Sequence, residues 1–208
     1  MKLKLDYSSI IRGEFTLSQL NIMLVMQVNC PGCLIYGIPA LTELYTEFKD
    51  EASFFIMSTA FEDFDINTEE NTRLLVEQGH IAGETQKTLA RYYNQTRYDV
   101  PDHFTVLFDK IIDSAALTST EMIAAVSKDQ QEVYNVPEEK REQFSKILHD
   151  HFMTLHKAGY TFAANLLQGT PTFLVFDDNY KILGSWFGHR NMTDMKHFIS
   201  NQQLKHST

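Results

Sequence analysis

Hydrophobic residues in this chain follow two kinds of pattern, which predict alternating strands and helices. Residues 22–28 are apolar except at Gln27, and residues 52–58 form a second run that is apolar nearly throughout. Between these runs, apolar side chains recur every three or four residues from Pro31 to Phe48, which is the spacing of one buried helix face. Strands of this kind are typical of sheets covered on both faces. We therefore predict a strand–helix–strand unit.

The alternation continues along most of the chain. Residues 3–20 indicate short strands and turns, and the sequence Asn67–Glu70 has capping-box spacing, which predicts a helix as far as about Gln78. The other predicted elements are a helix at 84–93, strands at 104–109, 172–176 and 181–186, and a final helix at 193–203.

Residues 113–165 have a different character and predict a helical insertion. Residues 118–121 again have capping-box spacing, Pro137 fits a first helical turn, and an apolar stripe runs from Phe144 to Leu155. We expect residues 1–112 and 166–208 to form one domain interrupted by this insertion. Its stripe could pack on that domain, or it could form a wall beside a binding cleft and select the partner.

Composition narrows the function classes. The 208 residues are 43% hydrophobic with five prolines, enough to bury a core without disulfides. A net charge of -9 argues against nucleic acid or an anionic membrane surface as a partner. The longest apolar run is too short to cross a bilayer, and no secretory signal follows Met1, so we expect a cytoplasmic protein.

The chain has only two cysteines, and they lie in the sequence Cys30-Pro31-Gly32-Cys33. Random placement would give this spacing roughly once in a hundred chains. A strand ending at Asn29 and a helix starting near Pro31 would place the Cys30 sulfur at the positive end of the helix dipole, which lowers the pKa of a thiol. In the cytosol, such a pair is more often catalytic or metal-binding than structural.

Three roles are open for the cysteine pair. Cys30 could attack a disulfide and Cys33 could resolve the mixed disulfide that forms. The pair could instead be half of a zinc or copper site, but a closed zinc site needs two further ligands and no second CxxC supplies them. An inert disulfide is the third reading. We expect the redox role, with no metal and no cofactor.

Several segments together carry a resemblance to a known family. Residues 15–20 lead into a strand and the CPGC sequence, residues 104–109 form a middle strand, and residues 169–177 contain Thr170-Pro171 before another apolar strand. This order resembles the thioredoxin superfamily, and within it the TlpA-like thiol-disulfide oxidoreductases related to the AhpC/TSA group. The resemblance implies an α/β thioredoxin-like fold, a central mixed sheet flanked by helices, with the helical insertion before the cis-proline strand.

The resemblance also implies that Thr170 and Pro171 lie beside the Cys30 sulfur. A cis bond there would let the Thr170 backbone pair with an incoming peptide like an extra strand. The alternative is an ordinary trans proline that opens an edge strand. The position of this step after Gly169, in a chain that also has CxxC, favours the cis form.

The chain departs from the family pattern at several positions. Asn29 replaces the usual aromatic residue before the first cysteine, and Pro39 lies six residues past Cys33 rather than five. Leu24 stands where thioredoxins bury an aspartate, so help with deprotonating Cys33 must come from elsewhere or from water. Gln27 stands where peroxiredoxins place a hydroxyl residue.

We therefore expect a thiol-disulfide oxidoreductase that acts on protein or small-molecule disulfides or dithiols with an unknown redox partner. The rivals are a peroxiredoxin-like thiol peroxidase, in which Cys33 captures a sulfenic acid formed on Cys30, and a thiolate metal-binding module. The acidic stretch Glu62–Asp65 could line the site or only face solvent. His103 and His189, near strand ends, could approach its edge.

Overall fold

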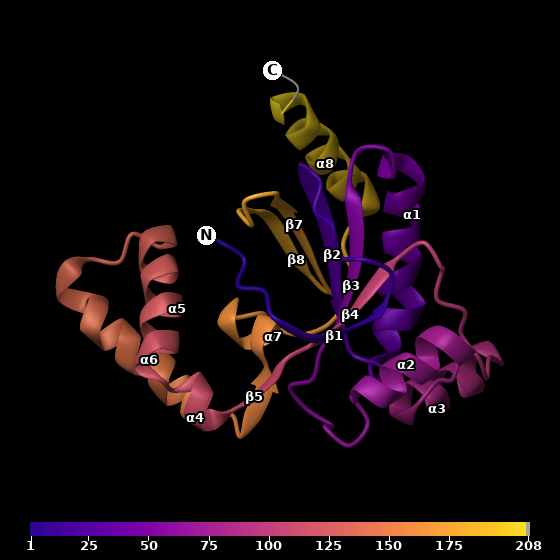
Figure 1. The fold of residues 1–208 in the computed structure, drawn as a ribbon, viewed down its shortest axis with the longest axis horizontal. Helices are drawn as coiled ribbons and strands as arrows, with labels where there is room; N and C mark the ends of the chain where they lie inside the picture. Colours follow the sequence, from indigo (N-terminus) through magenta and orange to yellow (C-terminus); the bar gives the residue numbers. More distant parts are fainter. Residues whose placement is uncertain (207–208) are drawn as a thin grey trace.

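A six-stranded mixed sheet forms the centre of the computed structural model, which describes residues 1–206. The strand order is β1-β4-β3-β2-β7-β8 (Figure 1). The strands are β1 (Tyr7–Arg12), β2 (Leu20–Met26), β3 (Ser53–Ser58), β4 (Thr105–Asp109), β7 (Thr172–Asp177) and β8 (Ile182–Phe187).

Strand direction brings the carboxyl ends of three strands to one edge of this sheet. β2, β3 and β4 run parallel, with Met26 opposite Ser58 and Ser58 opposite Phe108, so their carboxyl ends meet at the same edge. β7 runs antiparallel to β2, and Thr172 at its start lies opposite Val25 near the end of β2. The segments that follow β2 and precede β7 therefore come together at this edge.

Both faces of the sheet are covered, as the apolar strands predict. One face packs against η1 (Cys33–Gly37), α1 (Ile38–Phe48), α2 (Glu69–Gln78), α3 (Gly83–Tyr93) and α8 (Met192–His206). The other face packs largely against the N-terminal segment, including Leu3 and Phe15. The predicted α/β class with a central mixed sheet and flanking helices is confirmed. In the part of the chain that the structure describes, no helix has the length and apolar character needed to span a membrane.

The first helix resolves the unusual spacing of Pro39. Residues 33–37 form a π-helical turn, in which the Ile38 N–H donates to the Cys33 carbonyl five residues earlier. A π turn accommodates one residue more than an α turn. Pro39 therefore lies in the first turn of α1, directly after the π turn. The extra residue between Cys33 and Pro39 is absorbed in this turn.

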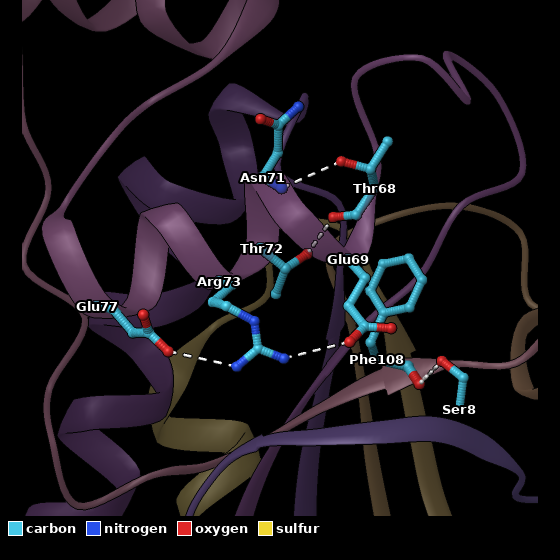
Figure 2. A network of polar contacts seen from close by, with 8 residues as sticks. All are labelled: Ser8, Thr68, Glu69, Asn71, Thr72, Arg73, Glu77 and Phe108. Atoms are coloured by element: carbon cyan, nitrogen blue, oxygen red, sulfur yellow. Dashed lines mark hydrogen bonds and ion pairs between the residues drawn. The ribbon is translucent and has the colours of Figure 1, made fainter.

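The start of α2 differs from the prediction by one residue. Thr68, not Asn67, is the N-cap, and its hydroxyl accepts a hydrogen bond from the Asn71 N–H (Figure 2). Asn67 is buried and uses its side chain elsewhere, as described below. Figure 2 also shows Arg73 between Glu69 and Glu77, which stabilises the exposed side of the helix.

The segment between β4 and β7 contains the expected helices and an unexpected two-stranded sheet. Its elements are β5 (Ile111–Asp113), α4 (Ser114–Leu117), α5 (Thr120–Val133), η2 (Glu138–Lys140), α6 (Arg141–Met153), β6 (Lys157–Gly159) and α7 (Tyr160–Ala164). Figure 1 shows α5 and α6 on the opposite side of the molecule from α1, α2 and α3. We call residues 111–164 the helical segment.

The helical segment has a small core of its own. Leu117, Val126, Leu148 and Phe152 are buried together. The predicted stripe is correct at Leu148 and Phe152, whereas Ile147 is 60% exposed because it lies beyond the edge of this small core. The N-cap of α5 is Ser119, one residue later than the predicted start of the capping box.

A buried carboxylate joins the helical segment to the sheet. Asp109, the last residue of β4, accepts hydrogen bonds from the Thr59 hydroxyl at 2.7 Å and from the N–H groups of Thr161 and Phe162 at 2.9 and 3.2 Å. A side chain on Gly159 would collide with both Thr59 and Asp109, so the close packing requires glycine there. Burial raises the pKa of Asp109 to about 6, although these hydrogen bonds oppose the change.

Candidate active site

Cys30 and Cys33 lie at the edge of the sheet where β2, β3 and β4 end. Four residues separate the end of β2 from a helical turn that begins at Pro31, and the Cys33 N–H donates to the Cys30 carbonyl at 3.0 Å. Both cysteines are free thiols. Cys30 is half-buried, while Cys33 is fully buried beneath it in the main core. Only Cys30 is therefore open to a substrate.

The surroundings of Cys30 favour its thiolate. Its pKa is lowered to about 7, first by a hydrogen bond with Cys33 and then by hydrogen bonds with Thr170 and with backbone N–H groups of Cys33 and Gly32. Partial burial acts in the opposite direction. Near neutral pH, a large fraction of Cys30 is thus ionised and nucleophilic.

Cys33 has the opposite character. Burial raises its pKa well above the ordinary value, and the hydrogen bond and negative charge of Cys30 raise it further. A hydrogen bond from the Gln27 backbone opposes this change. Cys33 therefore keeps its proton while Cys30 is ionised, so the two thiols are ready for different steps.

Thr170 and Pro171 lie directly against the cysteine pair. The peptide bond between them is cis, and the Cys30 thiol donates to the Thr170 carbonyl at 3.5 Å. The Pro171 ring packs so closely on the π turn that a side chain on Gly37 would lie 3.1 Å from its Cβ. Gly32 is exposed at the mouth of the site and Pro31 is partly exposed. All six residues singled out in the sequence thus lie in one place.

Comparison with known proteins agrees with the fold described above. Two solved structures, a thioredoxin-like superfamily protein and a thiol-disulfide isomerase from Corynebacterium glutamicum, each superpose with a TM-score of 0.57. The first is 16% identical and covers 98% of this chain and 96% of its own. The second is 15% identical and covers 97% and 94%. No protein-family model and no curated protein matches the sequence.

The chain has a thioredoxin-like fold. At this level of identity the comparison establishes the arrangement of the chain, and the chemistry rests on the residues themselves. The TlpA-like and AhpC/TSA affinities stay predictions from the sequence.

Polar side chains beside Cys30 hold the loop that carries it. The Asn29 N–H donates to Asn67 Oδ1 at 2.9 Å, and Asn29 Nδ2 donates to Asp63 Oδ2 at 2.7 Å. Asn29 Oδ1 in turn accepts from the Glu84 N–H at 2.5 Å. The acidic stretch therefore contacts the residue before Cys30 through Asp63, although Glu62, Asp63 and Asp65 remain exposed.

Gln27 is a site residue whose role the sequence analysis missed. Its side chain is 2% exposed and lies between Thr170 and the Glu62 backbone. The available signal was a single amide within an apolar run, since a buried polar group requires hydrogen-bond partners. Those partners lie 35 and 143 residues away in the chain, so their identity required the fold.

The two histidines near strand ends take up aromatic packing. His103 stacks on Tyr45 with ring centroids 3.7 Å apart, and burial lowers its pKa. His189 packs on Tyr36, whose hydroxyl accepts from the Arg190 N–H. Among the side chains that the structure describes, no three His, Cys, Asp or Glu residues gather in a group suited to a metal ion.

Proposed function

We propose that this protein is a dithiol–disulfide oxidoreductase in which Cys30 is the nucleophile and Cys33 the resolving thiol. The observation that carries the proposal is the contrast within the pair. The pKa of the accessible thiol is lowered to about 7, whereas that of the buried thiol beside it is raised. Disulfide exchange needs this division, because the first thiol must attack as an anion and the second must wait.

The reaction proceeds in two exchanges. The Cys30 thiolate attacks one sulfur of a substrate disulfide; the substrate S–S bond breaks, and the departing substrate thiolate takes a proton from water. Cys33 then loses its proton and attacks Cys30 Sγ, which releases the second substrate thiol and leaves a Cys30–Cys33 disulfide. Two electrons pass from the protein to the substrate. A dithiol redox partner returns them by the reverse sequence.

Deprotonation of Cys33 is linked to the first exchange. While Cys30 is an anion, its charge and hydrogen bond raise the pKa of Cys33. Formation of the mixed disulfide removes that charge, and with it one of the causes that raise the pKa of Cys33. The resolving thiol therefore becomes more acidic only once a substrate is attached, and water can serve as the proton acceptor.

The substrate is expected to lie across Thr170, Pro171, Pro31 and Gly32. The Thr170 carbonyl accepts a hydrogen bond from the protonated Cys30 thiol, and ionisation of the thiol frees the carbonyl to accept from a backbone N–H of an incoming chain. This arrangement suits a disulfide within an extended polypeptide, and a small disulfide could use the same sulfur contact.

The experiment is turnover of a quenched fluorescent peptide disulfide with a dithiol reductant in excess. The expected result is catalytic reduction by the wild-type protein and, with Cys33→Ser, a mixed disulfide of protein and peptide that intact mass detects. A wild-type protein that leaves the peptide disulfide at its uncatalysed rate would refute the proposal. Faster consumption of hydrogen peroxide than of disulfide would favour the peroxidase reading instead.

A further inference from the structure

A groove of about 450 Å³ lies beside the cis-proline loop. Its lining includes Gln168 and Thr172, each two residues from Thr170, and Phe187, which pairs with Thr172 across β7 and β8. The Phe187 ring lies directly against Gly169, since a side chain on that glycine would come within 2.6 Å of the ring. The groove therefore begins where a polypeptide that pairs with the Thr170 backbone would continue.

The helical segment supplies another part of the wall of this groove. Tyr134 follows α5 and Phe144 lies in α6, and both line the groove. Tyr134 is 70% exposed and Phe187 is 42% exposed. Aromatic rings left open to solvent on separate parts of one groove favour an apolar group as its occupant. The groove supports the second role considered for this segment in the sequence, a wall beside a binding cleft.

The groove also contains a cation. Of the described residues that line it, only Arg190 has a charged side chain. Both hydrogen bonds of Arg190 are made by its backbone, and its guanidinium has no hydrogen-bond or ion-pair partner among the described residues. The guanidinium is therefore available to a carboxylate of a bound molecule.

The turn that carries this cation is tied to the dithiol site at two points. The Tyr36 hydroxyl, in the π turn, accepts from the Arg190 N–H at 2.8 Å and donates to the Arg190 carbonyl at 3.0 Å. The Gly188 N–H donates to the Pro171 carbonyl at 2.8 Å. The backbone of Arg190 is thus fixed relative to both the cysteine pair and the cis-proline loop.

We propose that this groove is a substrate subsite, which binds an acidic side chain at Arg190 and a large apolar side chain against Tyr134 and Phe187. The proposal names the substrate class of the oxidoreductase function argued above and rests on that function. Paired backbones advance together residue by residue, so positions two residues from a substrate cysteine held at Thr170 come level with Gln168 and the groove. The preferred substrate is therefore a polypeptide disulfide with acidic and apolar residues beside its cysteine.

The first test compares two peptide disulfides, which carry either Glu or Gln two residues before and two residues after the cysteine. Wild type should reduce the Glu peptide with a kcat/KM about three to five times that of the Gln peptide, as for one partly exposed ion pair. Arg190→Gln should bring this ratio to about one, and Arg190→Lys should keep a preference for Glu. Arg73→Gln is the matched control, because it removes an exposed arginine from α2, on the other side of the molecule from α5 and α6 (Figure 1).

The second test concerns the wall supplied by the helical segment. It uses Glu peptides with either Phe or Ala next to the glutamates. Tyr134→Ala should lower kcat/KM for the Phe peptide by about three to ten times and for the Ala peptide by less, because only Phe gains an aromatic contact. Tyr92→Ala removes a tyrosine that is similarly exposed, at 68%, but lies in α3, and should leave both peptides unaffected. Equal losses with the two peptides would contradict the contact with Tyr134.

Two results would overturn the subsite. One is an equal kcat/KM for the Glu and Gln peptides in wild type, and the other is a Glu preference that Arg190→Gln leaves unchanged. Hydroxyethyl disulfide, which has no charge and no side chain to fill the groove, separates these failures from failure of the oxidoreductase function. A wild-type protein that reduces this small disulfide but does not distinguish the peptides lacks the subsite, whereas one that reduces no disulfide refutes the oxidoreductase function itself.

Discussion

Cys30 and Asp109 are two acids at the carboxyl ends of parallel strands, at the same edge of one sheet, and their pKa values are displaced in opposite directions. Cys30 follows β2 and its pKa is lowered to about 7. Asp109 ends β4 and its pKa is raised to about 6. Both are surrounded by hydrogen-bond donors, so the presence of donors does not explain the difference.

Burial explains it. Asp109 accepts from three donors, yet none of its surface is exposed, and the loss of hydration outweighs the hydrogen bonds. Cys30 keeps part of its surface open to water, so the donors prevail. Cys33 follows the same rule as Asp109, since it is fully buried and its pKa is raised. A solvent-accessible anion such as the Cys30 thiolate can attack a substrate. A buried carboxylate such as Asp109 can instead hold two parts of the structure together.

The largest expected effect is on activity and comes from removing the Cys30 thiolate. Cys30→Ser should abolish reduction of a peptide disulfide, because a serine hydroxyl is not ionised near neutral pH and cannot form the mixed disulfide. The measurement is turnover with a dithiol reductant. Residual catalysis above the uncatalysed rate would contradict the assignment of Cys30 as the nucleophile. Unfolding of the variant in denaturant, compared with wild type, separates loss of chemistry from loss of fold.

Removal of the buried Asp109 carboxylate should lower the stability of the protein. Asp109→Ala leaves the Thr59 hydroxyl and two N–H groups at the start of α7 without their acceptor, which should lower the free energy of unfolding by about 3 kcal/mol. Asp178→Ala, which removes an exposed carboxylate, should change it by less than about 0.5 kcal/mol. If Asp109→Ala and Asp178→Ala changed the unfolding free energy in denaturant by the same amount, Asp109 would not connect the helical segment to the sheet.

The raised pKa of Asp109 predicts a pH dependence of stability. In the unfolded chain the carboxyl titrates near its ordinary value of 3.8, and in the folded chain near 6. Between these values the folded state holds more protons, so the contribution of Asp109 to stability is complete below about pH 4 and is lost as the pH rises through 6. The loss should reach about 2 to 3 kcal/mol.

Asp109→Asn should lack this dependence, because its side chain does not titrate. The measurement is the difference in unfolding free energy between wild type and this variant from pH 4 to 7. A difference that stays constant over this range would contradict the raised pKa.

The smallest expected effect concerns the outer contact of the helical segment. The Lys157 ammonium lies 4.4 Å from the centre of the Phe64 ring, on the loop that also contacts Asn29 through Asp63. Lys157→Met removes the charge but keeps the length, and should lower stability by about 0.5 kcal/mol, as for an exposed cation–π contact. In a protein that already carries Lys157→Met, the further change Phe64→Leu should remove no more of the stability that this contact provides. Additive losses in the double variant would show that the two side chains do not interact.

The sequence predicts what depends on neighbouring residues. The buried strands, the helix after Pro31 and the CPGC pair follow from local periodicity and spacing. The family resemblance brings Thr170 to Cys30, and the observed contact agrees with it. The insertion could be recognised as helical because the stripe at Leu148 and Phe152 is also local.

Contacts between distant residues could not be predicted in this way. The acceptor role of Asp109 depends on Thr161, 52 residues later, and the β5–β6 pair joins three-residue strands too short to show a period. Gln27 was noted only for the hydroxyl residue it replaces. The hydrogen-bond partners of its amide, the Thr170 hydroxyl and the Glu62 carbonyl, are brought together only by the fold.

The most direct measurement is an equilibrium titration of the Cys30–Cys33 pair across defined thiol and disulfide buffers, read by alkylation and intact mass. A thiolate poised above a buried thiol predicts one reversible two-electron transition between the dithiol and an intramolecular disulfide. A potential of about -270 mV would indicate a reductase and one of about -120 mV an oxidant. If no buffer ratio produces a Cys30–Cys33 disulfide that reduction reverses, the pair is not a redox couple and the proposed function is wrong.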